Sequence, residues 1–69
     1  MRMQLRTNLF SDGTATWDVF IYDGDEDVVE INLQTTRHDN AEWDFFRLHS
    51  LIEEVTGASV PVSRITTQY

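Results

Sequence analysis

The densest group of side chains that could do chemistry is an acidic run, Asp23-Gly24-Asp25-Glu26-Asp27. Carboxylate-rich loops bind calcium, and counting from Asp23 the run fills the first, third and fifth positions of an EF-hand loop. The glycine and the bidentate glutamate that such a loop needs further on are replaced by Val28 and Gln34. We therefore interpret the run as a solvated hairpin loop, whose like charges favour a compensating cation, a basic partner or water.

Histidine is the other residue type with suitable chemistry, and the chain has two, His38 and His49. His49 and Glu53 are four residues apart on an expected helix, so their side chains can touch. A metal site needs three or four ligands, and the chain has no cysteine to complete one. A glycine-rich phosphate loop and a nucleophile–base pattern are also missing from the sequence. The sequence therefore predicts no catalytic residue, metal or cofactor, and a small enzyme or metal protein remains only a third alternative.

Aromatic side chains are more informative, because four Phe, two Trp and two Tyr are a heavy load for the core of a 69-residue chain. Trp43 and Phe46 point roughly 140–200° away from the apolar stripe of the expected helix, and Arg47 lies beside them. Phe20 and Tyr22 share one face of an expected strand, opposite its other apolar residues. Trp, Tyr, Phe and Arg are enriched at the centres of protein interfaces. We therefore predict that these five residues contact a partner. Phe10 would join the strand group if the first strand pairs with the second as a hairpin.

Composition narrows the class of partner. The chain has 12 acidic and 5 basic residues, so its formal net charge is −7. Nucleic acids and anionic lipids bind through Lys and Arg, so both are disfavoured as direct partners. The length allows a single domain, residues 1–69. The first residues have no apolar run behind them, and no stretch is long enough to cross a bilayer, so we expect a cytoplasmic protein.

Three strands are expected in the first half of the chain. Apolar and polar residues alternate over residues 3–9, and residues 14–22 are rich in β-branched and aromatic types. Asp12-Gly13 is a turn signal that joins these two segments as a hairpin, and Asp23-Gly24 begins a second turn. Residues 29–34 alternate again and predict a half-buried third strand.

The second half predicts a helix followed by a last strand. Asp39 with Glu42 three residues later is typical of an N-cap and its capping-box partner, after a loop over residues 35–40. A single apolar stripe follows, made of Ala41, Phe45, Leu48, Ile52 and Val55, with Leu51 at its edge. Gly57 ends the helix, since glycine readily adopts positive φ. Residues 58–67 predict a strand, which Pro61 places at a sheet edge.

The expected fold class is therefore α+β. The element order is β-β-β-α-β, and we expect an antiparallel four-stranded sheet with the helix packed on one face. Such an arrangement leaves the other face of the sheet uncovered.

Two functions from different classes follow. The first is a non-enzymatic binding protein, in which aromatic anchors ringed by carboxylates occlude a basic surface of a nucleic-acid-handling protein, as small acidic phage and mobile-element inhibitors do. This is an analogy from size and charge. The acidic contacts would be Asp23, Asp25, Glu26, Asp27, Asp39, Glu42 and Asp44. The alternative is a structural module that self-associates as a homodimer through the open sheet face or an edge strand.

Overall fold

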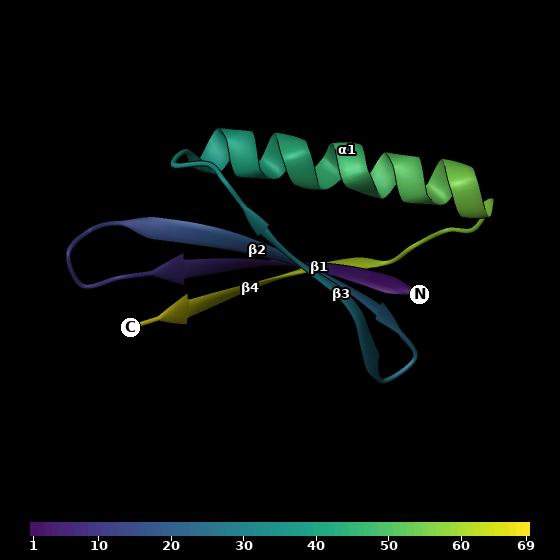
Figure 1. Cartoon of the computed structure of the whole chain (residues 1–69), viewed down its shortest axis with the longest axis horizontal. Helices are drawn as coiled ribbons and strands as arrows, with labels where there is room; N and C mark the ends of the chain where they lie inside the picture. Colours follow the sequence, from purple (N-terminus) through teal and green to yellow (C-terminus); the bar gives the residue numbers. More distant parts are fainter.

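The computed structural model describes the backbone of residues 1–69 and the side chains of residues 1–26 and 29–69. Four strands and one helix follow along the chain as β1 (Arg2–Leu9), β2 (Ala15–Asp23), β3 (Glu26–Leu33), α1 (His38–Thr56) and β4 (Val62–Gln68). The strands form one sheet, and α1 lies across one of its faces (Figure 1). The α+β class with one helix and a four-stranded sheet is thus confirmed.

The sheet is mixed, which corrects the expected purely antiparallel arrangement. In space the strands follow the order β3-β2-β1-β4, in which β1–β2 and β2–β3 are antiparallel and β1–β4 is parallel. The physical reason is the crossover through α1: the helix carries the chain back along the sheet, so β4 must start from the end where β3 started. The expected location of the last strand at a sheet edge is confirmed, with Pro61 just before it.

Strand pairing sets opposite residues of neighbouring strands on the same face, under the helix. Leu5 faces Val19, Thr7 faces Trp17, and Val19 in turn faces Ile31. The buried core is completed by residues of α1 and the segment before β4; its members are Met3, Leu5, Trp17, Val19, Ile21, Ala41, Phe45 and Val60. Because side chains alternate along a strand, Phe20 and Tyr22 lie on the opposite, helix-free face, as the sequence predicts.

The start of the helix differs from the expected capping box. The N-cap is Arg37, in extended conformation with φ −123° and ψ 133°, and no side chain caps the first turn. Asp39 lies inside the first turn, where its charge still interacts favourably with the helix dipole. Glu42 is not the capping-box partner, because the helix begins two residues earlier than expected and the third residue after the N-cap is Asn40. Glu42 is bound by Arg64 of β4, at 2.7 Å between Nη2 and Oε2.

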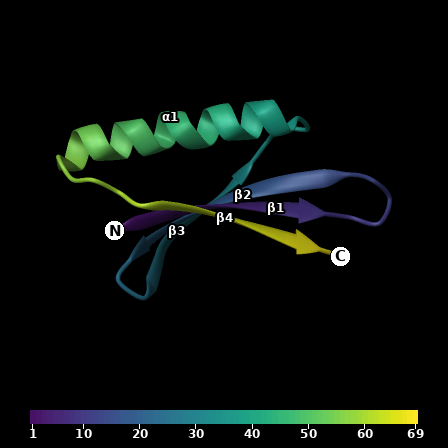
Figure 2. The same cartoon turned by 180° about the vertical axis from the view of Figure 1, so that it is seen from behind.

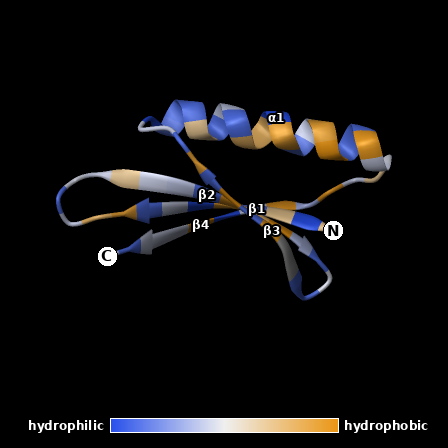
Figure 3. Cartoon of the chain, viewed as in Figure 1, coloured by the Kyte–Doolittle hydropathy of each residue, from blue (hydrophilic) through white to orange (hydrophobic). Residues whose placement is uncertain are grey.

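The apolar stripe of α1 is only partly buried, which corrects the expectation that Val55 belongs to the buried stripe. Ala41 and Phe45 are fully buried, whereas Val55 is 77% exposed. Strands twist relative to their neighbours, and the β2–β3 hairpin bends away below the C-terminal half of α1 (Figures 1 and 2). This half of the helix therefore overhangs the sheet, and in Figure 3 it carries most of the hydrophobic colour of the helix.

The end of the helix agrees with the sequence. Gly57 adopts a left-handed conformation with φ 68°, and its N–H donates to the carbonyl of Glu53. The following segment is held to the helix by Val60, whose N–H donates to Oε2 of Glu53 at 2.8 Å. The carbonyl of Val60 accepts a hydrogen bond from Nε2 of His49 at 2.7 Å. These contacts direct the chain into β4.

Candidate protein-binding surface

The helix-free face of the sheet is covered by its own side chains. The guanidinium of Arg6 lies 4.6 Å from the ring centre of Phe20, and that of Arg2 lies 4.2 Å from the ring centre of Tyr22. The two rings stack on each other at 6.0 Å. Phe20 is consequently only 7% exposed and Tyr22 is half-buried. A partner would reach Phe20 only if Arg6 moved away.

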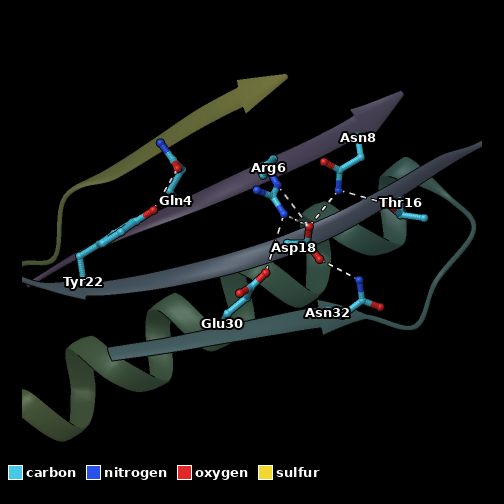
Figure 4. A network of polar contacts seen from close by, with 8 residues as sticks. All are labelled: Gln4, Arg6, Asn8, Thr16, Asp18, Tyr22, Glu30 and Asn32. Atoms are coloured by element: carbon cyan, nitrogen blue, oxygen red, sulfur yellow. Dashed lines mark hydrogen bonds and ion pairs between the residues drawn. The ribbon is translucent and has the colours of Figure 1, made fainter. Parts of the chain in front are cut away.

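A polar network centred on Asp18 fills the middle of the same face (Figure 4). Asp18 Oδ2 accepts hydrogen bonds from Arg6 Nη2 at 2.7 Å and Asn8 Nδ2 at 2.9 Å, and Oδ1 accepts one from Asn32 Nδ2 at 2.7 Å. Burial alone would raise the pKa of Asp18, but these hydrogen bonds outweigh it and hold the pKa below its ordinary value. A buried carboxylate satisfied in this way supports the fold and leaves little capacity for an incoming ligand.

Phe10 does not join the Phe20–Tyr22 pair. It lies beyond the other end of β1, where its ring stacks on that of Tyr69 with 5.1 Å between ring centres. Register explains the separation, because Tyr22 faces Arg2 at the start of β1 and Phe10 follows the end of that strand. The Phe20–Tyr22 pair and the Phe10–Tyr69 pair therefore lie toward opposite ends of β1.

The outward side of α1 is different, because its large apolar side chains are uncovered. Trp43 is 66% exposed, Leu51 is 55% exposed, and Phe46 is also exposed. They line one shallow hollow along the helix, together with Asp44, Arg47, Leu48, Ser50 and Glu54. We call this set the outer helix surface. It brings together four of the residues that the sequence predicts as partner contacts: Trp43, Asp44, Phe46 and Arg47.

A second hollow opens beside the overhanging half of α1. Its lining is apolar apart from Thr56, and consists of Met1, Ile21, Val29, Leu51, Ile52, Val55 and Thr56. We call it the side groove. Leu51 lines both hollows, so the outer helix surface and the side groove join at this residue. The groove exists because the twisted β2–β3 hairpin does not follow the helix to its end (Figure 1).

Phe46 is positioned by contacts at the edge of the helix that faces β4. Its ring packs edge-on against Phe45 in the core, with 5.3 Å between ring centres. The guanidinium of Arg64 lies 5.3 Å from the ring centre of Phe46 while it binds Glu42. Hydrogen bonds from Arg64 lower the pKa of Glu42. The ion pair therefore fixes one side of the outer helix surface, and Trp43 projects freely next to it.

The predicted acidic contacts do not form one patch. Asp23, Asp25 and Glu26 are exposed around the β2–β3 hairpin, whereas Asp39, Glu42 and Asp44 lie in the N-terminal half of α1, at the other end of the molecule (Figure 2). The side chain of Asp27 lies outside the described residues. The helix itself carries five carboxylates, at Asp39, Glu42, Asp44, Glu53 and Glu54, against one arginine. Of these, Asp44 and Glu54 belong to the outer helix surface, which also holds the arginine, Arg47.

The histidines take part in local contacts of the fold. His49 Nε2 also lies 3.6 Å from Glu53 Oε2, which confirms the expected contact between these two residues. Among the side chains that the structure describes, no three His, Cys, Asp or Glu residues gather closely enough to hold a metal ion. Within the same residues, α1 is not long and apolar enough to span a membrane.

Comparison with known proteins gives no relative: no protein-family model, curated protein or solved structure matches the chain. The function must therefore be inferred from the surface itself.

Sequence reasoning missed the side groove and the exposure of Leu51 and Val55. Both residues fit the apolar stripe of the helix by their spacing, so periodicity assigns them to the core. The length of the helix gives no signal either, since nineteen helical residues extend about 28 Å and the nine-residue β2 extends about 30 Å. The stripe is left partly uncovered by the twist of the sheet, which no local pattern of residues reports.

Proposed function

We propose that the chain is a non-enzymatic binding module, whose outer helix surface docks on a basic surface of another protein. The observation that carries this proposal is the position of Trp43: a tryptophan 66% exposed on a rigid helix, joined through Leu51 to an apolar groove and flanked by Asp44 and Glu54. Isolated exposed apolar residues are common, whereas a joined set with charged neighbours is typical of interaction sites.

The residue types suit an anchor surrounded by charge. Trp, Tyr and Arg dominate the binding energy of protein interfaces, because they fill pockets that exclude water. Trp43 would insert into such a pocket, with Arg47 one turn further along the helix. The cost of ordering is small, since α1 is already held to the sheet by Phe45 in the core and by the Glu42–Arg64 ion pair.

The charge of the surface selects the class of partner. The carboxylates of Asp44 and Glu54 on this surface and the net charge of −7 favour a basic partner and attract it over a distance of about one Debye length. Basic surfaces with apolar pockets are what nucleic-acid-handling proteins present to phosphates and bases. The carboxylates of the module would stand in place of phosphates, so that the bound module occludes the nucleic-acid site.

The proposal is tested by affinity capture with matched variants. Wild-type chain, Trp43→Ala and Tyr69→Ala are immobilised side by side and exposed to lysate of the native host. Tyr69 is a suitable control because it is another exposed aromatic residue and does not line the outer helix surface. We expect a protein that wild type and Tyr69→Ala retain, that Trp43→Ala loses, and that double-stranded DNA or RNA displaces.

Salt dependence of the purified pair then separates anchoring from charge. The association rate should fall steeply between low and physiological ionic strength, and Asp44→Asn with Glu54→Gln should weaken that dependence. Capture that is indifferent to Trp43→Ala would disprove the role of the outer helix surface. Association that does not respond to salt would disprove the electrostatic part.

A further inference from the structure

The outer edge of β4 offers a complete set of unpaired backbone groups. The carbonyl of Pro61 accepts from Met3 N–H and the N–H of Tyr69 donates to Leu9, so odd-numbered residues of this segment face β1. Backbone groups of successive residues in a strand point to alternate sides. The N–H and C=O of Val62, Arg64, Thr66 and Gln68 therefore point outward, because β4 is the last strand of the sheet.

This edge is only lightly protected against pairing, because its one charged side chain, Arg64, is bound by Glu42 and its proline, Pro61, lies before the strand. Natural edge strands carry lysines, inward charges, prolines or bulges that discourage another strand. β4 has the sequence VSRITTQ, and its pairing with β1 runs without a register shift from Met3–Val62 to Leu9–Gln68. The other edge strand, β3, has a bulge and carries the exposed acidic residues Glu26 and Glu30. The two edges are thus unequal.

Charge identifies a second copy of the chain as a suitable occupant of β4. Two molecules with a net charge of −7 repel each other, so a self-interface must lie where carboxylates are absent. Residues 55–69 contain no acidic residue and one arginine, while β3 would bring Glu26 and Glu30 of both copies together. The neutral edge is therefore the favourable one for self-association.

We propose that two copies pair antiparallel along β4, about a two-fold axis at Ile65. In this register Arg64 faces Thr66 of the second copy and Val62 faces its Gln68, so every outward N–H and C=O of the strand is paired. A shift by one residue toward the N-terminus would place Arg64 against the second Arg64 and leave Gln68 unpaired. Hydrogen bonding and charge both favour the same register.

Side chains on both faces of β4 fit this pairing. Ile65 is 45% exposed on the helix-free face and would pack against Ile65 of the second copy, in the closely spaced non-hydrogen-bonded position. Val62 and Phe46 are exposed on the helix side of the same edge. The result is a continuous sheet of twice the width, with both helices on one face. Apart from Phe46, the outer helix surfaces remain free in such a dimer.

The register can be read out by single cysteines, since the chain has none of its own. In the proposed dimer the Cα atoms at position 65 are about 4.5 Å apart, within the range of a disulfide. Those at position 63 are about 14 Å apart, which is too far for a disulfide. Under mild oxidation Ile65→Cys should therefore form a covalent dimer rapidly, and the matched control Ser63→Cys, on the same face of the same strand, should not. Equal rates would overturn the register.

Sedimentation equilibrium tests the dimer without any cross-link. The wild-type chain should be dimeric at micromolar concentration, and its melting temperature should rise with concentration. Thr66→Pro removes one outward N–H, which an edge strand tolerates, so this variant should be folded and monomeric. A wild-type chain that is monomeric at micromolar concentration, or a dimer that persists in Thr66→Pro, would overturn the proposal.

Discussion

Arg64 of β4 binds Glu42 of α1 with two hydrogen bonds, from Nε to Oε1 at 3.1 Å and from Nη2 to Oε2 at 2.7 Å. The pair is bidentate and joins residues far apart in the sequence, so it fixes the rotation of the helix above the edge strand. That rotation directs the next residue, Trp43, to solvent and lays Phe46 against the guanidinium of Arg64. One long-range ion pair thus connects the two surfaces that we propose for binding.

Removal of the Asp18 carboxylate should destabilise the fold more than removal of an exposed one. Asp18→Ala leaves Arg6, Asn8 and Asn32 without their common acceptor, and we expect a loss of about 2–3 kcal/mol. Asp23→Ala, at the exposed end of the same strand, should change stability by less than about 0.5 kcal/mol. Chemical denaturation monitored by circular dichroism measures both. Equal effects of the two variants would contradict the structural role of the network.

The contribution of Asp18 should depend on pH in a defined direction. Its pKa is held below the ordinary value, so the ionised form stabilises the folded state above that value, about pH 4. The stabilisation is lost as the pH falls through the lowered pKa. Protonation of the other carboxylates also relieves repulsion, so the informative quantity is the difference in unfolding free energy between wild type and Asp18→Asn. This difference should be constant near neutral pH and shrink in acid; a difference that grows in acid would be inconsistent with a lowered pKa.

Truncation of side chains at the two ends of the helical stripe should change the stability of the fold by different amounts. Phe45→Ala creates a cavity in the core and should cost about 3–5 kcal/mol, enough to unfold much of so small a domain. Val55→Ala should change stability by less than about 0.5 kcal/mol, because this side chain already contacts solvent. Thermal unfolding of the two variants gives the comparison. A large loss in Val55→Ala would mean that the helix packs on the sheet over its whole length.

The stability of the end of the helix should depend only on the backbone conformation of Gly57. Its φ is 68°, and a Cβ added there would meet no atom within 4 Å. Gly57→Ala should therefore cost about 1 kcal/mol through the left-handed conformation itself. The same position filled with D-alanine in a synthetic chain should be neutral or stabilising. Equal destabilisation by both stereoisomers would point to a steric contact instead.

Fluorescence should distinguish the two tryptophans. Trp17 is buried in the core, whereas Trp43 is largely exposed. Acrylamide is neutral and is not repelled by the acidic surface, so it should quench Trp43 strongly and Trp17 weakly. Trp43→Phe should leave a blue-shifted emission that resists quenching. Strong quenching in this variant would contradict the burial of Trp17, and protection of Trp43 in the free chain would indicate that the outer helix surface is already occupied.

Local sequence alone determined the elements and their faces. The two-residue period assigns Leu5, Val19 and Ile31 to one side of the sheet, and the helical period assigns Ala41 and Phe45 to the core and Trp43 to the outside. Gly57 marks the end of α1 for a local conformational reason. These features follow from the sequence because each depends on residues within one element.

Only the tertiary structure decided the direction of β4, the exposure of Val55 and the covering of Phe20. The direction of β4 follows from the crossover, and the exposure of Val55 follows from the twist of the sheet beneath the helix. Phe20 is covered because pairing of β1 with β2 places Arg6 beside it. Each of these features depends on where a distant segment of the chain lies, which is a consequence of packing that no local pattern of residues contains.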